Sequence, residues 1–202
     1  PGARARVGKG TVRGCGWLAG LGEELVDVSR LQDGRLRLIV SRLDILAELD
    51  EAVYMFTDRA RTEHKQLNYE ETTALPPVYG DVDRLRQVFV NIIDNALKYT
   101  SPGGTITVSS REDSGWVRVV ISDTGCGIPA EHLPNVKKKF YKANQLVRGS
   151  CIGLAVADEI VRLHGGALEI ESQEGVGTTV TISLPSCAHL EADPQLTDTP
   201  EL

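Results

Sequence analysis

Two asparagines and a lysine share one side of a segment whose other side is apolar. From residue 81 to residue 99, apolar residues recur at intervals of three and four, which predicts an amphipathic helix. Asn91, Asn95 and Lys98 lie on the polar side of that helix. A solvated helix face is the ordinary interpretation, but asparagine costs about 0.6 kcal/mol relative to alanine in a helix. The two neutral amides therefore favour a ligand that needs an oxygen donor without a net charge.

A second candidate is the run Asp123-Thr124-Gly125-Cys126-Gly127-Ile128, which directly follows a nearly all-apolar stretch. An aspartate at the end of a strand can accept a hydrogen bond from a ligand. Gly125 and Gly127 allow the backbone to approach that ligand closely. An ordinary turn explains the motif about as often. The run indicates a binding loop only together with other signals.

Basic residues precede a helix that starts at glycines. The basic residues are Lys137, Lys138, Lys139, Lys142 and Arg148, and they are followed by Gly149-Ser150-Cys151-Ile152-Gly153-Leu154. The free N–H groups and the dipole at the start of a helix attract anions. A lysine run is usually a solvated face, but in this position it favours a loop that covers phosphates.

The elements that must position these residues alternate between helix and strand patterns. Helices are expected at 45–61 with Asp44 as N-cap, at 81–99 with Asp81 as N-cap, and at 152–164. The expected strands are 36–40, 105–109, 116–122, 168–170 and 180–184, with 116–122 central and covered on both faces. Strands that neighbour one another in hairpins, mixed with helices, predict an α+β fold. We expect a two-layer α/β sandwich whose mixed sheet is covered by about three helices.

Composition excludes several classes of protein. The 202 residues include 22 Lys+Arg and 28 Asp+Glu, and 41% are hydrophobic, which excludes disorder throughout. No lysine or arginine follows Arg162, and this acidic end argues against a nucleic-acid partner. No apolar stretch approaches the 18 or so residues of a membrane span. The four cysteines are too far apart for a zinc pattern, so unpaired thiols in a reducing compartment are expected.

The order of the motifs resembles the ATP-binding domain of sensor histidine kinases, in the superfamily that also includes gyrase, Hsp90 and the MutL proteins. The five matching boxes are Asn91-Ile92-Ile93-Asp94-Asn95-Ala96-Leu97-Lys98-Tyr99, Asp123 to Gly127, Phe140-Tyr141, Gly149 to Leu154, and Gly177-Thr178 to Pro185. The resemblance implies the Bergerat (histidine kinase-like ATPase) fold.

Composition and the resemblance together divide the chain into four expected segments. Residues 1–22 are assigned no structure and are interpreted as disordered or appended. Residues 23–35 are similar to the end of the family's dimerisation helix and its linker. Residues 36–186 would form the ATP-binding domain, and 187–202 an acidic tail.

The resemblance implies a role for each residue of a nucleotide site. Asp123 would accept the adenine amino group, and Tyr99 would stack on the base. Asn95 would give its amide oxygen to Mg²⁺, and Asn91 would line the same site. Together with Lys98, these two asparagines are the candidate catalytic residues.

The triphosphate would be held by the later boxes. Lys98, Lys142 and Arg148 would offset its charge, and Gly149 and Gly153 would let backbone N–H groups reach it. The remaining candidates for cofactor binding are Gly125, Gly127, Ile128, Phe140, Tyr141, Ser150, Cys151, Ile152, Leu154 and Thr178.

Gyrase-type relatives have a glutamate at the position of Asn91, where it serves as general base for water. An amide cannot take a proton, so this site suits positioning of the γ-phosphoryl group for transfer to a histidine. The implied protein is a cytoplasmic histidine kinase of a two-component system that uses Mg-ATP. Its partners would be its own dimerisation domain and a response regulator. The full-length protein would be a homodimer, and this fragment would be a monomer.

No histidine fits the family's acceptor pattern, in which Glu or Asp follows at once and Pro stands five positions on. His64, His132 and His164 are followed by Lys, Leu and Gly, and His189, with Pro194 five positions on, is followed by Leu. We therefore expect a piece of a kinase that does not phosphorylate itself. His164 is expected to be a cation or cap at the end of its helix.

Two residues depart from the family pattern. Lys137 stands where an aromatic residue is usual, and Cys151 stands where the middle glycine of its box is expected. These departures leave open a degenerate module that serves in protein–protein contact. A serine kinase of the anti-sigma type is the other alternative, opposed by the partial helix that Gly34 ends.

Overall fold

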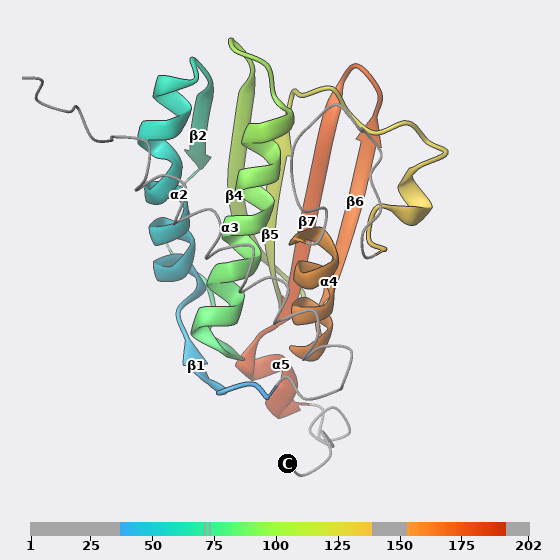
Figure 1. Cartoon of the computed structure of the whole chain (residues 1–202). Coiled ribbons are helices and arrows are strands. Elements are labelled where there is room, and N and C mark those ends of the chain that lie inside the picture. The colour runs from blue at the N-terminus through green and yellow to red at the C-terminus, as the bar shows by residue number, and fades with distance from the viewer. Residues whose placement is uncertain (1–36, 71, 73, 139–152, 193–202) are drawn as a thin grey trace, which may run out of the picture. The chain divides into compact units, whose positions relative to one another are not determined.

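The computed structural model describes residues 37–70, 72, 74–138 and 153–192. In this part of the chain, three helices cover one face of a five-stranded sheet (Figure 1). The strands, in spatial order, are β2 (Gln66–Glu70), β4 (Thr105–Asp113), β5 (Trp116–Asp123), β7 (Gly177–Pro185) and β6 (Ala167–Gln173). β2 pairs with β4 in parallel and the other neighbours are antiparallel, so the sheet is mixed.

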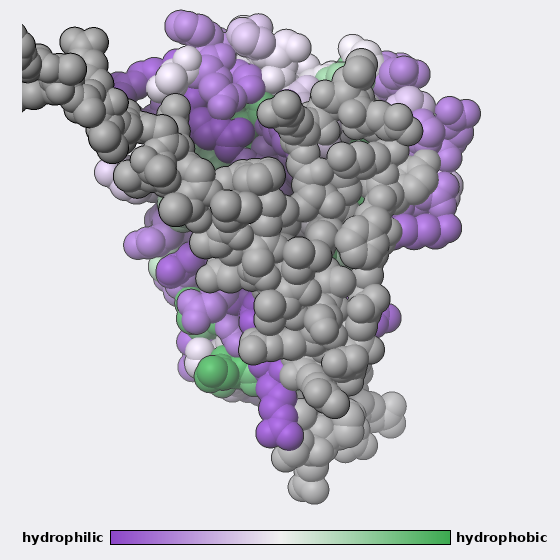
Figure 2. Space-filling view, in the orientation of Figure 1, coloured by the Kyte–Doolittle hydropathy of each residue, from purple (hydrophilic) through white to green (hydrophobic). Residues whose placement is uncertain are grey.

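The covering helices are α2 (Ile45–Thr62), α3 (Val82–Tyr99) and α4 (Gly153–Leu163). α3 packs between the other two and buries Leu85, Phe89 and Ile93 completely. The described residues that remain visible in the space-filling view are mostly hydrophilic (Figure 2). The predicted α+β class, with a mixed sheet under about three helices, is confirmed.

The shorter elements lie around this sandwich. β1 (Ser41–Leu43) and β3 (Val78–Gly80) form a separate antiparallel pair. A 3₁₀ helix spans Leu133–Asn135, and α5 spans Cys187–Ala192.

Capping aspartates begin both long helices, as predicted. The Asp44 side chain accepts a hydrogen bond from the backbone N–H of Leu46. The Asp81 side chain accepts from the N–H groups of Asp83 and Arg84. Each aspartate satisfies N–H groups that have no partner within the helix.

Two strand predictions were wrong in detail. The strand expected at 36–40 forms instead at Ser41–Leu43, because pairing with β3 begins at Ser41, while Ile39 and Val40 are exposed. β5 is central, but only one of its faces is fully buried. Val117 and Val119 lie under the helices, whereas the alternate residues are partly exposed. Helices cover only one face of this sheet (Figure 1), so the other face stays partly solvated.

Two strands and one helix were not predicted. β2 and β3 are short and lack an apolar run, so the sequence pattern gave no signal. The segment expected to be an acidic tail, 187–202, begins with a helix over Cys187–Ala192. Cys187 is buried, and the Ser186 hydroxyl accepts from the N–H of His189. Residues 193–202 lie outside the described part. Among the described cysteines, Cys126 and Cys187 are unpaired, as expected.

Candidate functional site

α3 brings the two asparagines to the start of α4. Asn91 and Asn95 lie one turn apart and are half-buried. The Asn91 amide nitrogen donates to the carbonyl oxygen of Gly153 at 3.3 Å. A Cβ atom on Gly153 would lie 3.4 Å from Asn91 Cγ, so the two helices approach closely here. Leu154 follows directly on α4, and the predicted candidates of the two helices are therefore neighbours.

The last turn of α3 carries Lys98 and Tyr99. The Lys98 ammonium lies 5.2 Å from the centroid of the Tyr99 ring, within the range of a cation–π interaction. The Tyr99 carbonyl oxygen accepts from the N–H of Cys126 at 3.2 Å. A Cβ atom on Gly125 would lie 2.5 Å from the same carbonyl oxygen. The glycine therefore lets the loop after β5 lie against the end of α3.

That loop is held by its own aspartate and by β6. Asp123 Oδ1 accepts from the N–H of Gly125 at 2.8 Å. Gly127 has φ +65°, and a Cβ atom there would lie 2.0 Å from the carbonyl oxygen of Gln173. A side chain at this position would be both strained and blocked. The backbone of residues 123–127 thus has little freedom.

Ser172 is a member of the site that the sequence did not indicate. Its hydroxyl accepts from the N–H of Ile128 at 2.8 Å and lies 2.8 Å from the hydroxyl of Thr178. Ile128 and Thr178, two predicted candidates far apart in the chain, are therefore joined through one side chain of β6. A serine at one position of an alternating strand carries no signal that would single it out.

Burial raises the pKa of the Asp123 carboxyl group above its ordinary value. Hydrogen bonds from the N–H groups of Gly125 and Thr178 oppose that shift in part. A poorly solvated carboxylate at the end of β5 is a strong acceptor for a ligand N–H group. Among the described residues, no group of three or more His, Cys, Asp or Glu could hold a metal ion.

Lys137, the departure from the aromatic pattern, has partners of its own. Its ammonium forms an ion pair with Asp158 of α4 at 2.8 Å and donates to the carbonyl oxygen of Leu168 in β6. The lysine therefore ties the segment after the 3₁₀ helix to both α4 and the sheet.

Eight of the predicted site residues lie outside the described part of the chain. They are Phe140, Tyr141, Lys142, Arg148, Gly149, Ser150, Cys151 and Ile152. The described residues hold the α3 candidates, the loop after β5, Thr178, and the first two residues of α4.

His164 lies at the end of α4, as predicted, but it is not a cation there. Its Nε2 atom accepts from the N–H of Asp81 at 3.0 Å, so Nδ1 carries the proton and donates to the carbonyl oxygen of Ile160 at 2.7 Å. Burial lowers the pKa of the imidazole. Of the two predicted roles, cation or cap, the imidazole therefore takes that of a cap, and it is neutral because the start of α3, distant in sequence, covers this position.

Comparison with known families agrees with this geometry. Residues 80–187 match the model of the family described as "Histidine kinase-, DNA gyrase B-, and HSP90-like ATPase". The chain belongs to this family. The match includes α3, the loop after β5, α4 and the last two strands, and the predicted ATP-binding catalytic domain of the sensor histidine kinase type is confirmed.

Histidine kinases are among the similar proteins. The adaptive-response sensory kinase SasA of Synechococcus elongatus is 36% identical over 165 residues, which are 80% of this chain and 43% of that kinase. The chain thus spans less than half the length of this relative.

Two solved structures share the fold. The structure of the Acinetobacter baumannii histidine kinase AdeS gives a TM-score of 0.69 at 27% identity, over 87% of this chain and 82% of that one. Full-length ShkA gives a TM-score of 0.75 at 24% identity, over 84% of this chain and 36% of that one.

Within the described residues, no helix has both the length and the apolar character that crossing a membrane requires.

Proposed function

We propose that the chain binds Mg-ATP at the C-terminal end of α3 and positions the γ-phosphoryl group for transfer to a histidine. One observation carries the proposal: the partly buried Asp123 carboxylate lies at the end of β5, and the loop that follows is hydrogen-bonded to Tyr99 through Cys126. The carboxylate would accept the adenine amino group, and the Tyr99 ring would stack on the base.

The asparagines fit a magnesium ion held mainly by phosphate. Mg²⁺ prefers hard oxygen ligands and takes several from phosphates and water, so a single amide oxygen from Asn95 is sufficient protein ligation. Bound there, the ion would neutralise phosphate charge. Asn91 lies one turn away, with its amide nitrogen engaged by Gly153. Neither residue can act as a general base, which favours phosphotransfer over hydrolysis.

The remaining roles belong to the same proposal. Lys98 would face the phosphates with Lys142 and Arg148, and the backbone from Gly149 to Gly153 would donate to them. Gly125, Gly127, Ile128 and Thr178 would shape the adenine end. Phe140, Tyr141, Ser150, Cys151, Ile152 and Leu154 complete the proposed site.

The phosphoryl acceptor would be a histidine on a dimerisation domain, and a response regulator would receive the group from it. The same proposal assigns residues 23–35 to the end of the dimerisation helix and residues 36–186 to the catalytic domain. It also includes a homodimeric full-length protein and a cytoplasmic setting, where ATP is available.

The decisive experiment measures ATP affinity by calorimetry for the natural chain and for Asp123→Asn. Losing a charge-assisted hydrogen bond should weaken ATP binding by roughly 10–150-fold. Asp50→Asn is the matched control, because Asp50 accepts from the Tyr69 hydroxyl on a different part of the molecule. Unchanged affinity in Asp123→Asn would remove Asp123 from the adenine role.

The kinase part of the proposal needs a separate assay. Incubation with γ-labelled ATP should label a supplied dimerisation domain at histidine, and the chain alone should stay unlabelled. Label on His64 or His189 would contradict the proposal.

A further inference from the structure

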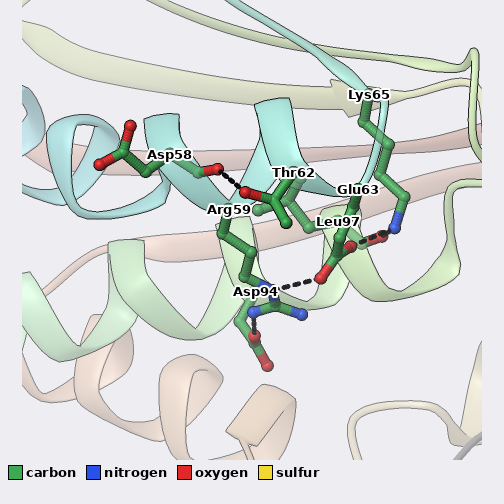
Figure 3. A network of polar contacts seen from close by, with 7 residues as sticks. All are labelled: Asp58, Arg59, Thr62, Glu63, Lys65, Asp94 and Leu97. Carbon is green, nitrogen blue, oxygen red and sulfur yellow. Dashed lines mark hydrogen bonds and ion pairs between the residues drawn. The ribbon is translucent and has the colours of Figure 1, made fainter.

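The chain leaves α2 through a residue in a left-handed conformation. His64 has φ +55°, and the N–H of Lys65, one residue on, donates to the carbonyl oxygen of Ala60. This is the usual way to close the end of a helix with a residue of positive φ. The turn directs the Lys65 side chain toward the last turn of α3 (Figure 3).

Lys65 is largely buried, with only 8% of its side chain exposed. Its ammonium donates to the carbonyl oxygen of Leu97 at 2.7 Å and pairs with Glu63. A buried ammonium needs such partners, because removing a charge from water is costly. Lys65 therefore links the end of α2 to α3 through a backbone carbonyl group.

Two further residues extend this link. Glu63 accepts from Arg59 Nε at 2.8 Å, and the Arg59 guanidinium forms an ion pair with Asp94 of α3 (Figure 3). We call Arg59, Glu63, Lys65 and Asp94 the Lys65 cluster. It contacts α3 at Asp94 and at Leu97, on either side of Asn95 in the sequence.

The carbonyl groups in the last turn of a helix have no helical partners. In α3, the Ala96 carbonyl accepts from Thr100, and the Tyr99 carbonyl accepts from the N–H of Cys126. The Leu97 carbonyl depends on Lys65, and Leu97 is completely buried. Without the ammonium, this carbonyl would lose its partner in a place that water reaches poorly.

We infer that the Lys65 cluster positions the last turn of α3, and with it Lys98, Tyr99 and the loop that Tyr99 holds, for nucleotide binding. The inference rests on the proposed function. Lys65 is a positioning residue: its contacts are with Leu97 and Glu63, and it acts on the nucleotide through α3.

The same two helices offer a matched control at their other end. Arg86 of α3 forms an ion pair with Glu48 of α2 at 2.7 Å. This pair also joins α2 to α3, but it lies more than two turns of α3 before Asn95. Lys65→Met and Arg86→Met each remove one cation from an α2–α3 link.

The experiment measures ATP and ADP affinity by calorimetry, under conditions where circular dichroism shows each variant folded. Lys65→Met should weaken binding of both nucleotides by about tenfold, because the turn would hold the base through Tyr99 and the phosphates through Lys98. Lys65→Arg, which keeps a cation with several donors, should recover most of the affinity. Arg86→Met should bind as the natural chain does.

Each outcome decides the inference. Equal affinity in Lys65→Met and Arg86→Met would overturn it while ATP binding itself stands. If the natural chain does not bind ATP, the proposed function and the inference both fail. If Lys65→Met does not fold, Glu63→Gln replaces it. This variant keeps the bond to Leu97 but removes the carboxylate beside the ammonium, so an affinity loss of about threefold supports the inference and no loss overturns it.

Discussion

The two ends of α3 use polar groups in opposite ways. At the N-terminal end, the Asp81 carboxylate accepts from three backbone N–H groups, those of Ile39, Asp83 and Arg84. The N–H of Asp81 itself donates to His164. Asp81 and His164 are only 6% and 8% exposed, so these groups satisfy one another away from water.

At the C-terminal end, polar side chains remain partly accessible. Asn95, Lys98 and Tyr99 are half-buried, and Asp123 carries a carboxylate that burial has made costly to ionise. The backbone carbonyl groups of this turn are held by Thr100, Lys65 and Cys126. α3 is thus anchored at its N-terminal end and presents accessible polar side chains at its C-terminal end. Stability and nucleotide binding should therefore be separable by mutation.

Asp81→Ala should have the largest effect on stability. It removes three accepted hydrogen bonds from a buried cap, so we expect the free energy of unfolding to fall by about 3 kcal/mol. Urea denaturation measures this loss, and ATP affinity of the folded variant should change less than about twofold. Asp44→Ala, which removes one exposed capping bond of α2, should cost only about 1 kcal/mol. Equal losses of unfolding free energy in Asp81→Ala and Asp44→Ala would contradict the prediction that the buried cap contributes more than the exposed one.

Gly127→Ala tests the C-terminal end of α3 and the loop after β5 that lies against it. The added Cβ atom would meet the Gln173 carbonyl oxygen at 2.0 Å, so the loop must move. We expect a loss of about 2 kcal/mol in stability and at least about tenfold in ATP affinity. Gly175→Ala is the matched control, since Gly175 has φ +75° but nothing within 4 Å of an added Cβ atom. It should cost about 1 kcal/mol and leave ATP affinity unchanged. Equal affinity in the two variants would mean that the loop tolerates displacement.

The pH dependence of stability should have opposite signs at the two ends. The pKa of His164 is lowered from 6.5, so the unfolded chain takes up the proton first as the pH falls. The contribution of His164 to the free energy of unfolding is fully present above about pH 6.5 and decreases as the pH falls below that value. The total loss is about 1.4 kcal/mol for each unit by which folding lowers the pKa. The pKa of Asp123 is raised from 3.8, so its ionisation costs stability as the pH rises from 3.8 through the raised value.

Urea denaturation of the natural chain and of His164→Gln between pH 7.5 and 5.5 tests whether His164 makes the chain less stable as the pH falls. The natural chain should lose stability more steeply as the pH falls, because glutamine does not titrate. Identical slopes would show that His164 keeps the same pKa when the chain unfolds.

Local patterns predicted the features that depend on local rules. The period of α3 and its capping aspartate both appear within 19 residues, and the glycines at 125 and 127 stand where backbone approaches backbone. The order of these motifs was enough to indicate the family.

Features that arise from packing between distant segments could not be predicted. Lys65 meets Leu97 only because α2 and α3 lie side by side, and 32 positions separate the two residues. The neutral state of His164 depends on an N–H group 83 positions away. β2 was not predicted because three of its five residues, Gln66, Asn68 and Glu70, are polar. The two half-buried residues between them are too few to give a strand pattern.

The parallel pairing of β2 with β4 has a consequence for the order of folding. β4 with β5 and β6 with β7 are connected by short turns and can form as hairpins early. β2 reaches β4 only after the chain has passed through β3 and α3, so its pairing must close a long loop and should come late. Lys65 immediately precedes this edge strand. Local opening of the edge would release Lys65 from α3 while both hairpins persist, and the C-terminal end of α3 would then loosen before the sheet unfolds.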